Sequence, residues 1–177
     1  AGGGIKGRMF AWSAKQARAY SLASEKTFGP GPFKKIRHGI ADALVLKKIR
    51  SILGPNLRYI VSGGAPLATD LAHFYAGMGI TLIQGYGLSE TTGPIAVQHI
   101  GKNPVGGVGL PLPGNFIKIA KDGEILVRGQ SVMPGYYHLP EQTAEVMPDG
   151  KWFHTGDLGS IDRKGQLTIT GRKKELI

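Results

Sequence analysis

Apolar residues recur at helical spacing in two stretches near the start of the chain. The first stretch runs from residue 9 to about residue 25, and the glycines and prolines within residues 27–32 end it. The second stretch fits residues 42–53, with Asp42 as the N-cap and Gly54-Pro55 as the stop. We therefore predict two helices in the first third of the chain.

The pattern then changes to short runs of residues that favour strands. Residues 57–61 and 80–83 predict two strands, and residues 69–77 predict a helix between them. A strand, a helix and a second strand in such quick succession indicate a βαβ unit with parallel strands. The carboxyl ends of parallel strands meet at one edge of a sheet, where ligands bind in open α/β folds. We therefore expect residues 62–66 and 84–87 to form loops at that edge.

Beyond residue 103 the sequence indicates short strands separated by turns. Lys121-Asp122-Gly123 is a hairpin signal, and Pro140 suits the first turn of a short helix. The expected strands are residues 116–120, 124–128, 152–154, 158–161 and 166–170. The predicted fold is thus α/β over residues 1–103, followed over residues 104–170 by a small antiparallel β subdomain, either a sheet or a partly open barrel.

Composition narrows the class of protein. The chain of 177 residues is 41% hydrophobic and 19% charged, so it can bury a core. It has no cysteine, which excludes a disulfide scaffold, a thiolate metal site and a cysteine nucleophile. No apolar run approaches the roughly 18 residues of a membrane span, and no signal peptide opens the chain. The expected location is cytoplasmic.

The formal net charge of +10 lies entirely in the first third of the chain. Residues 1–58 hold 12 of the 22 Lys and Arg but only two acidic residues, whereas residues 59–177 are balanced. A basic segment of this kind can meet nucleic acid, anionic lipid or a phosphate-bearing ligand, and it can equally be a solvated face. One hypothesis is peripheral contact with an anionic membrane.

Residues 84–92, Gln-Gly-Tyr-Gly-Leu-Ser-Glu-Thr-Thr, hold the most unusual chemistry. The segment fails as a dinucleotide fingerprint because the third glycine would fall at Glu90, and as a nucleophile elbow because Thr91 would have to be glycine. It offers glycines that admit a ligand to the backbone, the ring of Tyr86, hydroxyls that include Ser89, and one carboxylate. This set suits a nucleotide with its magnesium ion, while a structural turn with a buried tyrosine explains the pattern equally well.

Two further clusters are ambiguous when taken alone. In Thr155-Gly156-Asp157 the acidic residue follows a glycine at an expected strand boundary, where it can accept both hydroxyls of a ribose or cap a turn. Gly171-Arg172-Lys173-Lys174 is basic, which in isolation indicates a solvated terminus. Neither cluster decides between a functional and a structural interpretation.

Five motifs together occur in the order and spacing of one known family. They are Ser62-Gly63-Gly64-Ala65-Pro66-Leu67, Gly85-Tyr86-Gly87-Leu88-Ser89-Glu90-Thr91, Gly123-Glu124-Ile125 with Gly129 and Gly135-Tyr136, Thr155-Gly156-Asp157, and Gly171-Arg172-Lys173-Lys174. Over about residues 40–177 the chain resembles the adenylate-forming acyl-CoA synthetases, or AMP-binding enzymes, and most closely the long-chain fatty-acid–CoA ligases. The resemblance implies an internal part of the large N-terminal domain, with residues 171–177 starting the hinge to a C-terminal lid domain.

The resemblance also implies a reaction and a role for each matching residue. A fatty acid attacks ATP and releases pyrophosphate, and coenzyme A then displaces AMP from the acyl-adenylate. The residues implied to hold the adenine are Tyr86 and the backbone of Gly63, Gly64 and Ala65, with Gln84 or its neighbour near the adenine amine. Gly85 and Gly87 are also implied to belong to the nucleotide site. Those implied to contact ribose and phosphates are Asp157, Arg172 and Ser89. At the position of Ser89 most relatives have threonine, which keeps the hydroxyl. Glu90 is the implied Mg²⁺ ligand and Lys174 the implied hinge residue. Glu90, Ser89 and Arg172 are the expected catalytic residues.

The family's catalysis also uses groups that lie outside these 177 residues. Its Ser/Thr/Gly-rich phosphate loop lies upstream of the adenine motifs, and its adenylation lysine lies in the lid. We therefore expect the chain alone to be inactive and to need the remaining parts of the same enzyme. The alternatives are another adenylate-forming enzyme, such as a short-chain or aryl-CoA ligase or a peptide-synthetase adenylation domain, and a basic nucleic-acid-binding domain. The last lacks aromatic residues between its basic ones, so no nucleic acid is expected as a partner.

Overall fold

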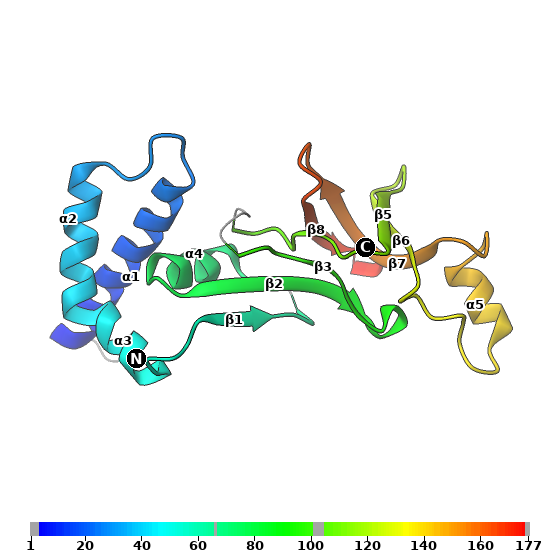
Figure 1. The fold of residues 1–177 in the computed structure, drawn as a ribbon, viewed down its shortest axis with the longest axis horizontal. Coiled ribbons are helices and arrows are strands. Elements are labelled where there is room, and N and C mark those ends of the chain that lie inside the picture. The colour runs from blue at the N-terminus through cyan, green and yellow to red at the C-terminus, as the bar shows by residue number, and fades with distance from the viewer. Residues whose placement is uncertain (1–3, 66, 101–104, 176–177) are drawn as a thin grey trace. The chain divides into compact units, whose positions relative to one another are not determined.

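The structure is a computed structural model that describes residues 4–65, 67–100 and 105–175. The chain divides into two compact units. Unit 1 comprises residues 1–61, 67–82 and 104–106, and unit 2 comprises residues 62–66, 83–103 and 107–177. Figure 1 shows that helices dominate the first unit and strands the second.

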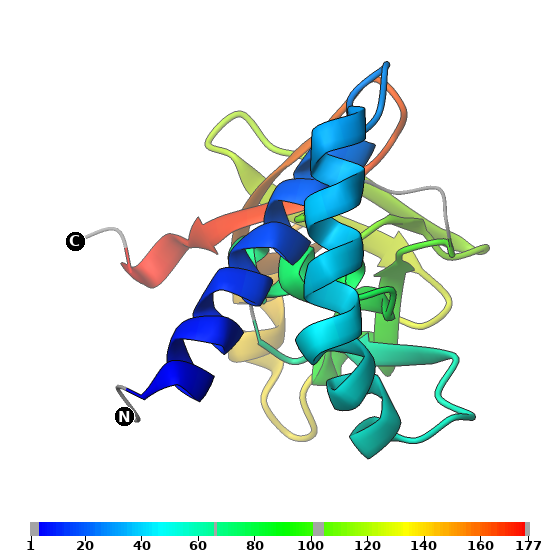
Figure 2. The same cartoon turned by 90° about the vertical axis from the view of Figure 1, so that its left-hand side faces the viewer.

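Closely packed helices build unit 1. α1 (Ile5–Ser24) includes the first predicted helix, and it packs beside α2 (Pro32–Ala41), as Figure 2 shows. α4 (Thr69–Gly77) confirms another predicted helix and approaches α1 so closely that a Cβ on Gly77 would lie 1.9 Å from the carbonyl oxygen of Ala17. Small residues at this contact let the two backbones meet. The buried core of the unit consists of Ala17, Ala41, Leu46, Met78 and Ile80.

The helix predicted over residues 42–53 ends where expected but starts earlier. α2 continues through a π-helical turn (Asp42–Leu46) into α3 (Lys47–Leu53), and Gly54 follows with a φ of 103°. The prediction of Asp42 as an N-cap is therefore wrong, because its backbone is helical and Pro32 starts the helix. Instead, its carboxylate accepts hydrogen bonds of 2.5 and 2.9 Å from Arg50, whose guanidinium lowers the pKa of Asp42.

The first sheet has the strand order β1-β2-β3-β4. Its strands are β1 (Tyr59–Ser62), β2 (Thr81–Leu88), β3 (Gly93–Val97) and β4 (Leu110–Pro111). β1 and β2 are neighbours in this sheet, and α4 lies between them in the sequence, as in the predicted βαβ unit. β3 runs antiparallel to β2, and β4 runs antiparallel to β3.

The prediction of a loop at residues 84–87 is wrong, because β2 continues through them to Leu88 and pairs with β3. One of the glycines that indicated a loop, Gly87, instead allows the two backbones to approach each other. A Cβ on Gly87 would lie 2.0 Å from the carbonyl oxygen of Gly93. The motif thus stands on a paired strand, and only Ser89–Thr91 forms a turn of 3₁₀ helix beyond it.

The second sheet is an antiparallel sheet in which the strands follow their sequence order. Its strands are β5 (Asn115–Ile119), β6 (Glu124–Gly129), β7 (Phe153–Ile161) and β8 (Leu167–Arg172), and a 3₁₀ turn (Lys173–Glu175) follows β8. The predicted hairpin at residues 121–123 is confirmed, and α5 (Pro140–Val146) starts at Pro140 as predicted. The predicted strand boundary at Thr155-Gly156-Asp157 is wrong, because β7 runs through these residues with a shift in register.

Unit 2 has its own hydrophobic core. Its buried members are Ile95, Ala96, Val108, Ile125, Val127 and Leu167. Because Ile95 and Ala96 lie on β3, the structure groups residues 83–103 with the later strands rather than dividing the chain at residue 103. The predicted fold class, α/β followed by a small antiparallel β part, is confirmed. No helix within the described residues is long and apolar enough to cross a membrane.

Candidate functional site

Asp157 is the centre of a polar group to which three strands of unit 2 contribute. The residue is 8% exposed and lies on β7. Its Oδ2 accepts a hydrogen bond of 2.7 Å from the hydroxyl of Tyr86 on β2, and its Oδ1 accepts one of 3.2 Å from Nε of Arg172 on β8. Asp157 and Arg172 are direct partners in the β7–β8 ladder. The structure thus brings together three residues that the sequence analysis assigned to one nucleotide site.

The hydroxyl of Tyr86 acts as a donor in this group. The ring packs against the core of unit 2. Burial, together with the hydrogen bond to the negatively charged Asp157, raises the pKa of Tyr86 above its ordinary value of 10.0. The phenol therefore stays protonated, and a flat apolar ring lies directly beside a carboxylate. A base and its ribose need these two surfaces next to each other.

The first glycine motif lies beside β2. A Cβ on Gly63 would lie 3.5 Å from the carbonyl oxygen of Gly85. Gly64 has a φ of 78°, in the region that favours glycine. Gly63, Gly64 and Ala65 are all exposed, so their backbone is accessible to a ligand. The predicted proximity of residues 62–66 to residues 84–87 is confirmed at this contact.

Gln84 is buried, with 7% of its surface exposed. Its N–H donates to Oε1 of Gln98 at 2.9 Å, and its carbonyl oxygen accepts from the N–H of Gln98 at 2.9 Å. Both bonds extend the pairing of β2 with the segment that follows β3. The backbone of Gln84 therefore belongs to the sheet, whereas the sequence analysis expected it in a loop.

Glu90 lies just beyond β2 in a turn that hydrogen bonds stabilise. The fully buried hydroxyl of Thr91 accepts the N–H of Leu88 at 2.8 Å and lies 2.8 Å from the carbonyl oxygen of Gly93. The Glu90 carboxylate accepts a hydrogen bond of 2.9 Å from the hydroxyl of Tyr136, and burial together with this contact raises the pKa of Tyr136. The turn thus presents one half-buried carboxylate in a fixed position.

The carboxylate of Glu90 is of the type that contributes to Mg²⁺ sites completed by a substrate's phosphates. Within the described ranges, no three Asp, Glu or His side chains gather into a group that could hold a metal ion by themselves. Mg²⁺ is usually bound by one or two carboxylates together with substrate phosphates and water, rather than by an all-protein cage. A single carboxylate such as that of Glu90 is therefore compatible with this role.

Two further predicted site residues lie in turns that follow strands. Ser89 begins the turn after β2, and Lys174 lies in the turn after β8; both are exposed. The sequence analysis assigned no role to Tyr136 or Glu124, although both are parts of the third motif. The sequence feature that could have identified them is that both are polar, whereas the other residues of this motif are small or apolar.

The sequence model of the AMP-binding enzyme family matches residues 12–137. The chain belongs to the AMP-binding enzymes. It is 51% identical over 172 residues to the long-chain-fatty-acid–CoA ligase FadD15 of Mycobacterium bovis, a match that covers 97% of this chain and 28% of that protein. It is 35% identical over 181 residues to the human long-chain-fatty-acid–CoA ligase ACSBG1, covering 99% of this chain and 24% of that protein. The chain thus spans about a quarter of the length of these AMP-binding relatives, and the resemblance drawn from the motifs is confirmed.

Solved structures of AMP-binding enzymes share the fold. A Mycobacterium tuberculosis fatty acyl CoA synthetase superimposes with a TM-score of 0.62 at 29% identity, covering 73% of this chain and 28% of that chain. The O-succinylbenzoate coenzyme A synthetase MenE of Bacillus subtilis, in complex with ATP and magnesium ion, gives a TM-score of 0.59 at 30% identity, covering 74% of this chain and 31% of that chain.

Proposed function

We propose that this chain is the nucleotide-binding part of a long-chain-fatty-acid–CoA ligase. The overall reaction converts ATP, a fatty acid and coenzyme A into acyl-CoA, AMP and pyrophosphate. The observation that carries the proposal is the contact of Asp157 with Tyr86 and Arg172, which come from three different strands. The identity to long-chain-fatty-acid–CoA ligases over nearly the whole chain favours a fatty acid over an aryl or amino acid.

The geometry of the Asp157 group suits the adenosine half of the nucleotide. The adenine stacks on the ring of Tyr86, with the exposed backbone of Gly63 and Gly64 on its other face. The buried Asp157 carboxylate accepts the hydroxyls of the ribose, because an anionic acceptor makes strong hydrogen bonds to neutral donors. Arg172 supplies a positive charge within reach of the ribose or the phosphate.

The phosphate half of the nucleotide extends toward the turn after β2. Ser89 offers its exposed hydroxyl to the α-phosphate, and Glu90 holds Mg²⁺. When bound, the ion screens the negative charge of the phosphates. A carboxylate oxygen of the fatty acid then attacks the α-phosphorus and pyrophosphate leaves; in the second step the coenzyme A thiolate attacks the acyl carbonyl and AMP leaves. Both steps depend on positioning and charge stabilisation rather than on a protein nucleophile.

The test compares AMP with 2′,3′-dideoxy-AMP, which lacks both ribose hydroxyls. Saturation-transfer NMR on the 177-residue chain measures the two affinities. Wild type is expected to prefer AMP. Asp157→Ala is expected to lower the AMP affinity by about tenfold or more, the effect of a lost hydrogen bond to a charged group, and to leave the affinity for the dideoxy analogue unchanged.

Asp162→Ala is the matched control for this test. Asp162 lies in the same unit and accepts backbone hydrogen bonds in the turn between β7 and β8. Its loss weakens a turn without touching the Asp157 group, so it is expected to retain the preference for AMP. Melting temperatures of all variants identify any that fail to fold. A folded Asp157→Ala chain with an unchanged preference for AMP, or a wild-type chain without one, contradicts the proposal.

We also propose that the ligase is cytoplasmic and contacts anionic membranes through unit 1. α2 exposes Phe33 and Ile36, which are 79% and 62% exposed. The exposed Lys34, Lys35 and Arg37 lie between and beside them. Phe33 and Ile36 are three residues apart and so lie on one face of the helix, and an exposed apolar face flanked by basic residues is typical of helices that lie on anionic lipid surfaces.

A further inference from the structure

Residues 155–157 form a bulge in β7. In the β6–β7 ladder Leu126 pairs with His154, and Glu124 pairs with Leu158. A step of two residues along β6 therefore spans a step of four residues along β7. Bulges of this kind change the direction of a side chain and are common beside functional sites. Here the bulge carries Asp157, the centre of the proposed ribose site.

Glu124 supplies the hydrogen bond that stabilises the bulge. Gly156 lies within the bulge at a φ of 73°, a conformation that favours glycine. Its N–H donates to Oε1 of Glu124 at 2.9 Å. A polar backbone group that lacks a partner away from water costs free energy, so this bond favours the bulged conformation over others.

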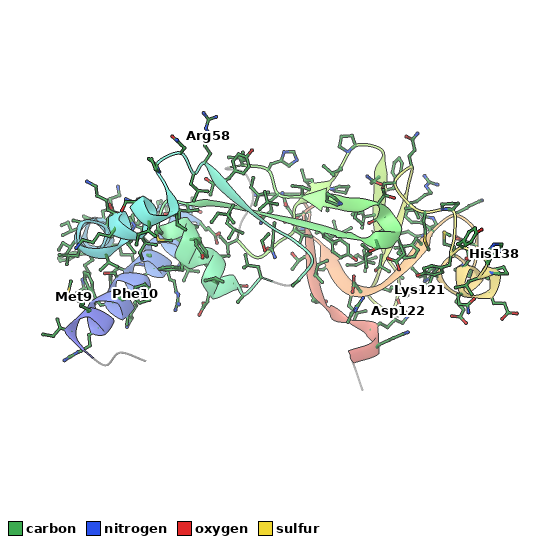
Figure 3. The ribbon with its side chains drawn as sticks, turned by 90° about the horizontal axis from the view of Figure 1, so that it is seen from below. Met9, Phe10, Arg58, Lys121, Asp122 and His138 are labelled. Carbon is green, nitrogen blue, oxygen red and sulfur yellow. The ribbon has the colours of Figure 1, made fainter. Side chains whose placement is uncertain are left out.

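The other oxygen of Glu124 is held from two sides. Oε2 accepts hydrogen bonds from Nδ1 of His154 at 3.1 Å and from Nζ of Lys173 at 3.0 Å. Lys173 also contacts Asp122 at 2.6 Å. Asp122, labelled in Figure 3, lies in the turn between β5 and β6. Burial alone would raise the pKa of Glu124, but the bonds from Lys173, Gly156 and His154 lower it. The residue is 4% exposed and has no other part in the proposed reaction.

We infer that Glu124 is a positioning residue of the ribose site. With Oε2 fixed by His154 and Lys173, Oε1 stays directed at the Gly156 N–H and holds the bulge that aims Asp157. The inference rests on the proposed function, because it gives Asp157 the ribose hydroxyls as its ligand. Glu124 does not contact the ligand itself. It bonds the backbone of Gly156, the residue before Asp157, and so acts on Asp157 through the backbone.

Two variants of Glu124 separate the hydrogen bond from the charge. Glu124→Gln keeps an oxygen that can accept the Gly156 N–H, whereas Glu124→Ala removes every contact. Amide hydrogen exchange at Gly156, measured by NMR on the 177-residue chain without nucleotide, reports the bond directly. Glu124→Ala is expected to accelerate this exchange about tenfold, and Glu124→Gln to stay within about threefold of wild type.

The second measurement is the preference for AMP over 2′,3′-dideoxy-AMP in the same variants. Glu124→Ala is expected to reduce it about fivefold or more, while Glu124→Gln and the turn control Asp162→Ala retain it. A general loss of stability would not act selectively on the ribose hydroxyls. An unchanged preference in a folded Glu124→Ala chain overturns the inference, and so does an equal loss in Glu124→Gln. If wild type shows no preference, the proposed function fails, while exchange at Gly156 still tests whether Glu124 holds the bulge.

Discussion

Replacing Gly87 with alanine tests why the strand that carries the proposed adenine contact contains glycines. Gly87 lies opposite Pro94 in the β2–β3 ladder. An added Cβ would lie 2.0 Å from the carbonyl oxygen of Gly93 and 2.7 Å from Cα of Pro94. These are backbone atoms, so no side-chain rotation relieves the contact. The strands would have to separate by about 1 Å, since Cβ atoms essentially never approach other atoms closer than 3.0 Å.

The magnitude follows from two effects. Inserting a methyl group into a closely packed site typically costs about 1–3 kcal/mol. Separating the strands also weakens the adjacent ladder, where each hydrogen bond contributes about 1 kcal/mol. We therefore expect Gly87→Ala to lower the free energy of unfolding by about 3 kcal/mol. With a urea dependence of about 2 kcal/mol per M, the unfolding midpoint falls by about 1.5 M.

Gly85→Ala is the matched control on the same strand. A Cβ on Gly85 would meet Cγ2 of Val97 at 3.6 Å and the carbonyl oxygen of Ala96 at 3.7 Å, which are ordinary contacts. Its unfolding free energy is expected to change by less than about 1 kcal/mol. Urea unfolding followed by the fluorescence of Trp152, in a Trp12→Phe background, measures unit 2 in both variants.

Equal unfolding midpoints for Gly87→Ala and Gly85→Ala would refute this reasoning. The pair also separates two explanations for glycine in this motif. If Gly85→Ala folds normally but binds AMP more weakly, the absence of a side chain at Gly85 serves the ligand. At Gly87, by contrast, it serves the pairing of β2 with β3.

Two further predictions concern unit 1. Gly77→Ala is expected to lower the free energy of unfolding by about 2–3 kcal/mol, because its Cβ would lie 1.9 Å from the carbonyl oxygen of Ala17. At the exposed Gly39 an added Cβ meets no atom within 4 Å, so Gly39→Ala is expected to raise the free energy of unfolding by about 0.5–1 kcal/mol. Urea unfolding followed by circular dichroism measures both changes. The chain is expected to sediment with anionic but not neutral vesicles, less so at high salt, and Phe33→Ser should weaken this binding; indifference to lipid charge would contradict the membrane proposal.

The sequence predicts those elements that local chemistry determines. The hairpin around Lys121-Asp122-Gly123, the start of α5 at Pro140 and the end of α3 before Gly54 all depend on the backbone preferences of a few neighbouring residues. The same preferences mislead at Gly85 and Gly87, where glycines indicate a loop. There, pairing with β3 overrides the local preference; at Gly87 the β3 backbone also comes so close that only a residue without a side chain fits.

The contacts of the site depend on partners far apart in the sequence. Tyr86 and Asp157 are 71 positions apart, and no spacing rule connects them. The sequence suggested their association only through resemblance to a family. Arg172 is different, because once the β7–β8 hairpin forms, strand register places it opposite Asp157. Pairing of two neighbouring strands is thus enough to bring Arg172 to Asp157, whereas Tyr86 reaches Asp157 only when the core of unit 2 has formed.

Glu124 shows the least predictable kind of residue. In the sequence it follows a turn glycine and starts a strand, where a charged side chain indicates a solvated edge. Its burial becomes understandable only from the bulge in β7, because that bulge presents the N–H of Gly156 to the start of β6. A buried carboxylate is costly unless several donors surround it, and Lys173 and His154 complete that set. We therefore explain the buried carboxylate of Glu124 by its effect on β7: its bond to Gly156 fixes the position of the next residue, Asp157.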